Sequence, residues 1–291
     1  MNRCCLFAIL SACLIAPACA QDAGKLTATG GVSQLEGAGG GGLTPWALIT
    51  GYGSRDSWGG NAHLTSVRTQ DYALDSAGVA FAWHDRLEFS LAQQQFRGSL
   101  APLDQLRIKQ DIAAVKVRLS GDAVYDQDLP WPQLAAGVMV KRNRGVEGLG
   151  ALGVSSVTQL GAKDEHGVDY YLAATKLYLD HSLLLNGTLR LTKANQMGIL
   201  GFGGDRRDRY QPMLEVSAAY MFSRKLVAGI EYRQKPHNLG VDNEKDYADV
   251  FVAWFPSKHL SVTAAYASLG DITVFNPVRQ NGAYLSLQIG F

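Results

Sequence analysis

The sequence predicts an all-β fold, a transmembrane antiparallel β-barrel of fourteen strands, with twelve strands as the alternative. Three observations carry this prediction. Apolar and polar residues alternate in segments of about ten to thirteen residues, close to the length of a tilted transmembrane strand. The connections between these segments alternate between short and long, which is typical of such barrels. The last segment, Ala283–Phe291, has apolar residues at every odd position and closes on an aromatic carboxylate.

The first twenty residues predict a secretory signal peptide. Arg3 supplies the positive charge, residues 6–15 supply an apolar stretch, and Ala18-Cys19-Ala20 forms a small-residue cleavage site before Gln21. The apolar stretch is shorter than the roughly 20 residues that a spanning helix needs. We therefore expect residues 1–20 to be removed.

We expect residues 21–291 to form a single barrel domain, and the composition excludes several kinds of functional site from it. All four cysteines lie in the first twenty residues, which excludes a disulfide framework, a thiolate metal site and a cysteine nucleophile from the mature chain. A lipoprotein-like box that would lipidate Cys13 is the alternative to cleavage. Without Arg3, the 27 basic residues become 26 and equal the 26 acidic residues, so the net charge of the mature chain is zero with neutral histidines. We expect no nucleic-acid partner, no cofactor and no metal.

Strand segments follow from the alternation. The twelve clearest are 60–69, 73–83, 86–96, 106–119, 132–142, 168–179, 182–193, 210–222, 225–234, 246–255, 259–268 and 282–291. Two further strands, 25–36 and 43–52, joined by an extracellular turn at 37–42, complete the fourteen. In the twelve-strand alternative, residues 25–58 instead form an N-terminal segment inside the lumen.

The connections orient the barrel. Counted back from the C-terminus, which should be periplasmic, the short turns are periplasmic and the long loops extracellular. The exception is residues 121–132, a long periplasmic connection. The predicted extracellular loops are 97–105, 143–167, 194–209, 235–245 and 269–281.

One face of the predicted strands is charged. A Lys or Arg on the lipid side would cost roughly 2–4 kcal/mol at the midplane, so we expect these side chains to point into the lumen. They are Glu88, Lys116, Arg118, Lys141, Lys176, Arg190, Glu215, Glu231, Arg233 and Asp249. Basic residues predominate in the segments between 106 and 193 and acidic ones between 210 and 255, so an open lumen would carry a transverse field.

Several motifs resemble a proteobacterial family that is catalogued only as a domain of unknown function and regarded as outer-membrane barrels. They are Gly30-Gly31-Val32-Ser33-Gln34-Leu35-Glu36-Gly37, Gly40-Gly41-Gly42-Leu43-Thr44-Pro45-Trp46-Ala47, Gly51-Tyr52-Gly53, Asp71-Tyr72, Arg86-Leu87-Glu88-Phe89-Ser90, Lys109-Gln110-Asp111 and Gly121-Asp122-Ala123-Val124-Tyr125-Asp126. The resemblance covers essentially the whole mature chain. It implies a location in the outer membrane of a Gram-negative bacterium and brings no catalytic residue.

The functional hypothesis from these patterns is a passive channel for small hydrophilic solutes. The alternative is a closed structural or surface-interaction barrel. A second alternative is an outer-membrane lipid-modifying enzyme, for which His166 and His237 are the histidines in predicted extracellular loops. Expected partners are outer-membrane lipid and lipopolysaccharide, small polar solutes, and the barrel-assembly machinery, which would bind the C-terminal strand that ends at Phe291.

Overall fold

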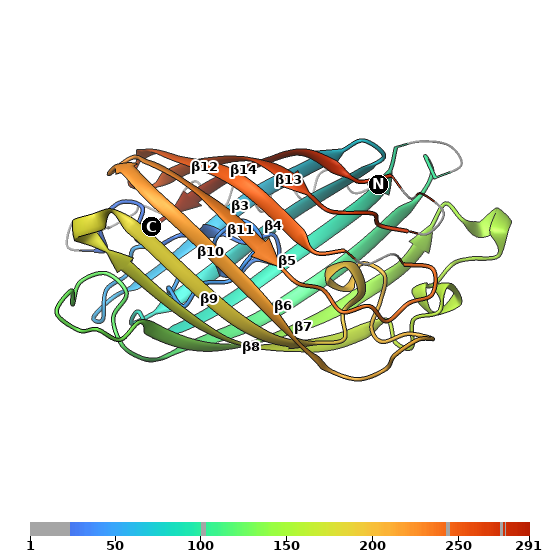
Figure 1. Ribbon diagram of the computed structural model, residues 1–291, viewed down its shortest axis with the longest axis horizontal. Helices are drawn as coiled ribbons and strands as arrows, with labels where there is room; N and C mark the ends of the chain where they lie inside the picture. The colour runs from blue at the N-terminus through green and yellow to red at the C-terminus, as the bar shows by residue number, and fades with distance from the viewer. Residues whose placement is uncertain (1–23, 100–102, 243–244, 274–275, 277) are drawn as a thin grey trace.

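The computed structural model describes residues 24–99, 103–242, 245–273, 276 and 278–291. Twelve strands, β3 to β14, form a closed barrel (Figure 1). Each strand pairs antiparallel with its neighbours in sequence, and β14 closes the ring by pairing with β3. The all-β antiparallel barrel is thus confirmed. The predicted signal peptide, with Cys13 and the cleavage site at Ala18, Ala20 and Gln21, lies outside the described residues.

The strands of the wall lie close to the segments expected from alternation. They are β3 (Trp58–Thr69), β4 (Tyr72–Trp83), β5 (Leu87–Gly98), β6 (Arg107–Ser120), β7 (Gln133–Glu147), β8 (His166–Tyr178), β9 (Leu183–Thr192), β10 (Gln211–Ser223), β11 (Leu226–Arg233), β12 (Tyr247–Ser257), β13 (Leu260–Ser268) and β14 (Asn281–Gly290). Four short 3₁₀ helices lie between them: η1 (Gly150–Leu152), η2 (Val157–Leu160), η3 (Leu179–His181) and η4 (Asn195–Gly198). In the described part of the chain, no helix has the length and apolar character to cross a membrane.

The wall is apolar outside and polar inside. In β9, Leu189 is 50% exposed on the outer face, whereas its neighbour Arg190 is 1% exposed. Large exposed apolar side chains recur in this way around the barrel, for example Leu91, Ile230 and Val250. An apolar outer belt over a polar interior is the arrangement of a transmembrane barrel, because lipid replaces water as the outer solvent.

The two ends of the barrel differ. At one end, which we name the turn end, lie the connections 84–86, 121–132, 179–182, 224–225 and 258–259, together with the C-terminus. At the other, the loop end, lie the connections 70–71, 99–106, 148–165, 193–210, 234–246 and 269–280. All the turn-end connections except 121–132 are short, as expected, whereas the loop-end connections are longer apart from the two-residue connection 70–71.

The prediction of fourteen strands is wrong, and the twelve-strand alternative is correct. Residues 25–36 and 43–52 are not wall strands, and the expected turn at 37–42 lies inside the barrel. Only two short pieces here are extended, β1 (Val32–Ser33) and β2 (Gly39–Gly40), and they pair with each other. The physical reason lies in the sequence, where the four consecutive glycines 39–42 and Pro45 disfavour a long strand. We name residues 29–51, all of which are buried, the plug.

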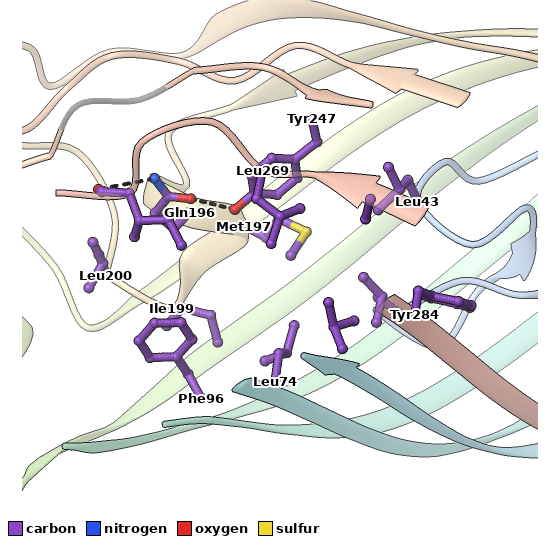
Figure 2. A pocket seen from close by; sticks show the side chains of 14 residues that line it. Leu43, Leu74, Phe96, Gln196, Met197, Ile199, Leu200, Tyr247, Leu269 and Tyr284 are labelled. Carbon is purple, nitrogen blue, oxygen red and sulfur yellow. Dashed lines mark hydrogen bonds between the residues drawn. The ribbon is translucent and has the colours of Figure 1, made fainter. Parts of the chain in front are cut away.

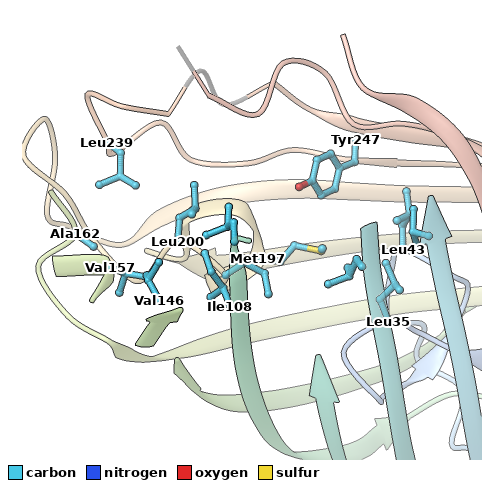
Figure 3. Close-up of a cluster of buried hydrophobic side chains, with 14 of the residues drawn as sticks. Leu35, Leu43, Ile108, Val146, Val157, Ala162, Met197, Leu200, Leu239 and Tyr247 are labelled. Carbon is cyan, nitrogen blue, oxygen red and sulfur yellow. The ribbon is translucent and has the colours of Figure 1, made fainter. Parts of the chain in front are cut away.

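The loop end is covered by packed apolar side chains. The cluster joins the connection 148–165 and the segment around η4 to the tip of the plug (Figure 3). Val157 and Leu239 are fully buried in it, and Met197 and Leu200 lie between them and plug residue Leu35. Burial of this apolar surface holds the loops over the mouth of the barrel.

Candidate functional site in the barrel lumen

The plug enters and leaves the lumen at the turn end. The amide of Lys25 donates to the carbonyl of Tyr52 at 2.9 Å, and the amide of Tyr52 donates to the carbonyl of the C-terminal Phe291, also at 2.9 Å. Between these points the plug bonds to itself: the amide of Gln34 donates to Ala38, and that of Leu35 to Gly42. The plug is therefore a folded hairpin that does not extend the wall by strand pairing, as far as the described residues show.

One carboxylate of the plug lies at the centre of a buried ion-pair cluster. Glu36 contacts Lys141, lies 2.7 Å from the Nη1 atom of Arg233 and lies 3.5 Å from the Nη2 atom of Arg190. Two wall carboxylates complete the cluster, Asp169 with Lys141 and Arg190, and Glu215 with Arg190 and Arg233. Three cations thus meet three anions, and each side chain is at most 4% exposed.

A second pair fixes the middle of the plug. The ammonium of Lys116 lies 3.0 Å from Glu88 and donates to three plug carbonyls, those of Gly39, Trp46 and Leu48, at 2.7 to 3.2 Å. The carboxylate of Glu88 in turn accepts from the amides of Gly39 at 2.9 Å and Thr50 at 2.8 Å. The wall here satisfies plug backbone groups that no sheet pairs, which is the requirement for burying irregular backbone.

A third contact joins the plug to β11. Glu231 accepts from the amide of Leu43 at 2.8 Å and from the hydroxyl of Thr44 at 2.6 Å, while Ser217 on β10 contacts the same hydroxyl at 2.5 Å. A Cβ atom on Gly41 would overlap the Glu231 carboxylate, so only glycine allows this close approach.

Neutral side chains of the wall also hold plug carbonyls. Ser76 and Gln94 donate to Leu35, Thr188 donates to Pro45, and Gln133 donates to Ala47, at distances of 2.6 to 2.8 Å.

Two of the ten predicted lumen residues, Arg118 and Lys176, bind groups at the turn end and, among the described residues, not the plug. Lys176 donates to carbonyls of the connection 121–132, those of Asp126 at 2.7 Å and Leu129 at 2.9 Å among them. Arg118 bonds to Asp122 at 3.0 Å in the same connection and to Asp85. These cations fasten a turn-end connection under the barrel and do not touch the plug in the described residues.

One side of the lumen leaves buried polar atoms without hydrogen-bond partners among the described residues. Both ring nitrogens of His63 on β3 are unpartnered, as are the hydroxyls of Ser261 on β13 and Tyr284 on β14 and one carboxylate oxygen of Asp249 on β12. These strands are consecutive in the barrel, and we name this region the seam. Buried polar groups need hydrogen-bond partners, and along this side the described protein atoms supply none to these groups.

Two apolar cavities lie next to the plug. The loop-end cavity, of about 40 Å³, lies between plug residues Leu35 and Leu43, the segment at Met197 and the wall (Figure 2). The turn-end cavity, of about 30 Å³, is lined by Val32 and Trp46 of the plug and by apolar wall residues. Each is far smaller than the roughly 150 Å³ in which benzene is known to bind.

Sequence reasoning missed two members of the central cluster, Glu36 and Asp169. Glu36 was placed on a wall strand, although it is a lone charge in a Gly-rich apolar stretch, and such a charge needs buried partners. Asp169 alternates with Tyr171, Ala173 and Thr175 on the buried face of β8, so its position was readable from the period of two. In the described part of the chain, no three His, Cys, Asp or Glu side chains gather as metal ligands.

Comparisons with solved structures find other barrels. The chain is similar to the NanC porin, with 8% identity, a TM-score of 0.53, and coverage of 79% of this chain and 98% of that one. Similarity to the KdgM porin has 9% identity, a TM-score of 0.49, and coverage of 79% and 99%. Omp33 of Acinetobacter baumannii matches with 7% identity, a TM-score of 0.47, and coverage of 80% and 98%. At these identities the likeness to NanC shows the fold alone.

No curated protein matches the chain. The model of one family, described as a protein of unknown function (DUF3034), matches residues 29–288, which include the plug and the wall from β3 to β13 in full. The chain therefore belongs to this family.

Proposed function

We propose that this protein is a gated channel in the outer membrane of a Gram-negative bacterium, closed in the observed state by its own plug. The attachment of the plug carries the proposal. It is held by side-chain contacts, it bonds internally through its backbone, and both its ends lie at the turn end. Such a hairpin can shift or withdraw without breaking the hydrogen bonds between wall strands.

The open passage inferred from the sequence differs from this proposal in one respect. Most of the charges expected to line a water-filled pore instead bind the plug or pair with its partners, as Lys141 and Arg190 do through Glu36. A passive hydrophilic pore would leave these groups facing water. We therefore assign them to the closed state, in which their role is to hold the plug.

The seam supports movement of the plug. The hydroxyl of Tyr284, which lies against Gly42 of the plug, would gain hydrogen bonds to water if the plug moved away. Part of the cost of breaking the plug contacts is thus offset on the other side of the lumen.

A disulfide lock tests the proposal, because the mature chain has no cysteine of its own. The hydroxyl oxygens of Thr44 and Ser217 are 2.5 Å apart, so T44C/S217C places two sulfur atoms within bonding range across the plug and the wall. We expect the oxidised variant to lose conductance in a planar bilayer and to regain it when the bond is reduced.

The matched control links two wall strands and leaves the plug free. The hydroxyl oxygens of Thr65 on β3 and Ser286 on β14 are 2.7 Å apart, and T65C/S286C should conduct equally in both redox states. Conductance that persists in the oxidised lock would show that solutes pass a stationary plug. A silent bilayer for the wild type and the reduced lock alike, with correct folding shown by gel mobility, would favour the closed structural barrel.

A further inference from the structure

The loop-end cavity is apolar on nearly all sides. Its lining joins leucines of the plug to Ile199 and Leu200 near η4 and to Phe96 and Leu269 (Figure 2). Two polar side chains in the lining, Gln196 and Tyr247, bond to each other. Water gains little in such a space, because it needs two to four polar partners.

The cavity has walls of different kinds. One wall is the plug, which the side chains of the barrel hold in place. A second wall is the segment Asn195–Gly198, in which Gln196 and Met197 have positive φ angles of 46° and 62°. Non-glycine residues in this region of backbone conformation are strained and cluster at ligand-binding and switch positions. The third wall is the barrel, whose strands are fixed by pairing on both sides. Leu269 and Ile272 of the connection 269–280 also line the cavity. Enlargement of the cavity therefore requires the plug, the η4 segment or this connection to move.

Tyr284 adds one polar position at the plug side of the cavity. Its side chain lines the cavity, and its hydroxyl has no hydrogen-bond partner among the described residues. A Cβ atom on Gly42 would lie 3.2 Å from this hydroxyl, so the group is pressed against the plug. If the plug moved away, the hydroxyl could bond to one polar group of a ligand.

We infer that the loop-end cavity binds a small apolar molecule, a short aliphatic chain or a single aromatic ring with at most one polar group, and that this binding displaces the plug. The inference rests on the proposed gating and adds the class of ligand. At about 40 Å³ the cavity does not admit a benzene-sized molecule in the closed state. The ligand thus binds the displaced state better, and such differential binding shifts the population toward that state.

The test measures plug exposure directly. Thr44 is fully buried in the closed lumen, so a T44C variant in lipid discs reports displacement by its rate of labelling with a membrane-impermeant maleimide. We expect benzene to raise this rate saturably, by about tenfold at about ten times its dissociation constant for the displaced state. Glucose at the same concentration should leave the rate unchanged.

A pair of matched variants tests whether benzene acts at the loop-end cavity. Ala267 on β13 lines the loop-end cavity, and A267L fills it with three further carbon atoms. Ala253 on β12 lines the turn-end cavity and is buried to a similar degree, so A253L is the control. The benzene-dependent rise should disappear in T44C/A267L and persist in T44C/A253L. A rise that persists in both variants would trace the effect to the membrane and overturn the inference.

The wild-type cavity gives a second readout that does not depend on these substitutions. A series of single-ring compounds of increasing size, tested on T44C alone, should show a limit above which labelling no longer accelerates. If the T44C variant is labelled at a measurable basal rate but no apolar probe changes that rate, the ligand inference fails and the gating proposal stands. If the T44C variant is never labelled and the T44C/S217C lock has no effect on conductance, the gating proposal fails as well.

Discussion

At the scale of single residues, the charge of Glu36 links the plug to three cations of the wall. Its carboxylate is the third anion that balances Lys141, Arg190 and Arg233, and all of these side chains are buried. Desolvating such groups is costly, and the cluster is stable only while every charge keeps its partners. The plug thus contributes the charge without which this cluster holds one cation too many.

E36Q keeps the shape of the side chain and removes this charge. Breaking a buried ion pair by removing one partner costs about 3–5 kcal/mol. The protein avoids this cost when the plug leaves, because water then solvates the remaining charges. We therefore expect E36Q to increase the time that single channels spend open. The control is D75N, since Asp75 pairs with Arg68 and Arg97 on the partly exposed surface, where an ion pair contributes about 0–1 kcal/mol. Equal open times in E36Q and the wild type would show that Glu36 does not hold the plug in the closed state.

At the scale of elements, the connection 121–132 resembles the plug in that charged side chains of the wall, Arg118 and Lys176, hold it in place. Asp122 accepts from the amides of Val124 at 2.9 Å and Tyr125 at 2.6 Å and bonds to Arg118. Burial raises the pKa of Asp122, but these hydrogen bonds and the Arg118 charge outweigh burial, and the pKa lies below its ordinary value of 3.8. The charged form therefore stabilises the folded connection.

This pKa predicts how stability changes with pH. A carboxylate with a depressed pKa contributes its full stability above pH 3.8 and loses it as the pH falls through the lower, folded-state value. D122N should thus lower the urea midpoint of unfolding near pH 7, and its difference from the wild type should shrink in acid below pH 3.8. The exposed neighbour Asp128 provides the control, since D128N removes a charge from the surface of the same connection and should leave the urea midpoint near pH 7 unchanged. A D122N deficit that stays constant down to the lowest pH would contradict this account.

The elements of the wall could be predicted from the sequence, whereas the plug was predicted only as the alternative, in which residues 25–58 form a segment inside the lumen. Each wall strand has lipid on one side, so a period of two marks its ends closely, as in the expected 60–69 against the observed Trp58–Thr69. Residues 25–36 show partial alternation as well, but they and residues 43–52 lie mostly buried inside the barrel. Their environment depends on contacts with strands far along the chain, such as Glu231 with Leu43, and no local pattern encodes those contacts.

The candidate site was predictable in part for the same reason. Alternation placed charges such as Lys116 and Glu231 on one face of their strands, and the structure finds them buried. It could not show what they bind. Lys116 has plug carbonyls as its partners, and backbone carbonyls carry no signature in the sequence.

At the scale of the whole molecule, the plug and the wall are two units that differ in how they are held. Every wall strand pairs with two neighbours, and the ring has no free edge. The plug pairs β1 with β2 and bridges Gly40 to Pro45, all within itself, and otherwise relies on side chains of the lumen. Local opening costs least where few backbone bonds must break, so the plug should leave before the wall unfolds.

The expected result is two separate transitions in urea. In the T44C variant, maleimide labelling of the introduced thiol should reach half its maximum at a lower urea concentration than the change in gel mobility that reports wall unfolding. E36Q in the same background should move the first transition to lower urea and leave the second in place, because the bonds between wall strands do not involve Glu36. D75N provides the comparison for a charge removed from the outer surface. Coincident transitions would show that the plug belongs to the cooperative unit of the wall, and a plug that leaves only on global unfolding cannot serve as a gate.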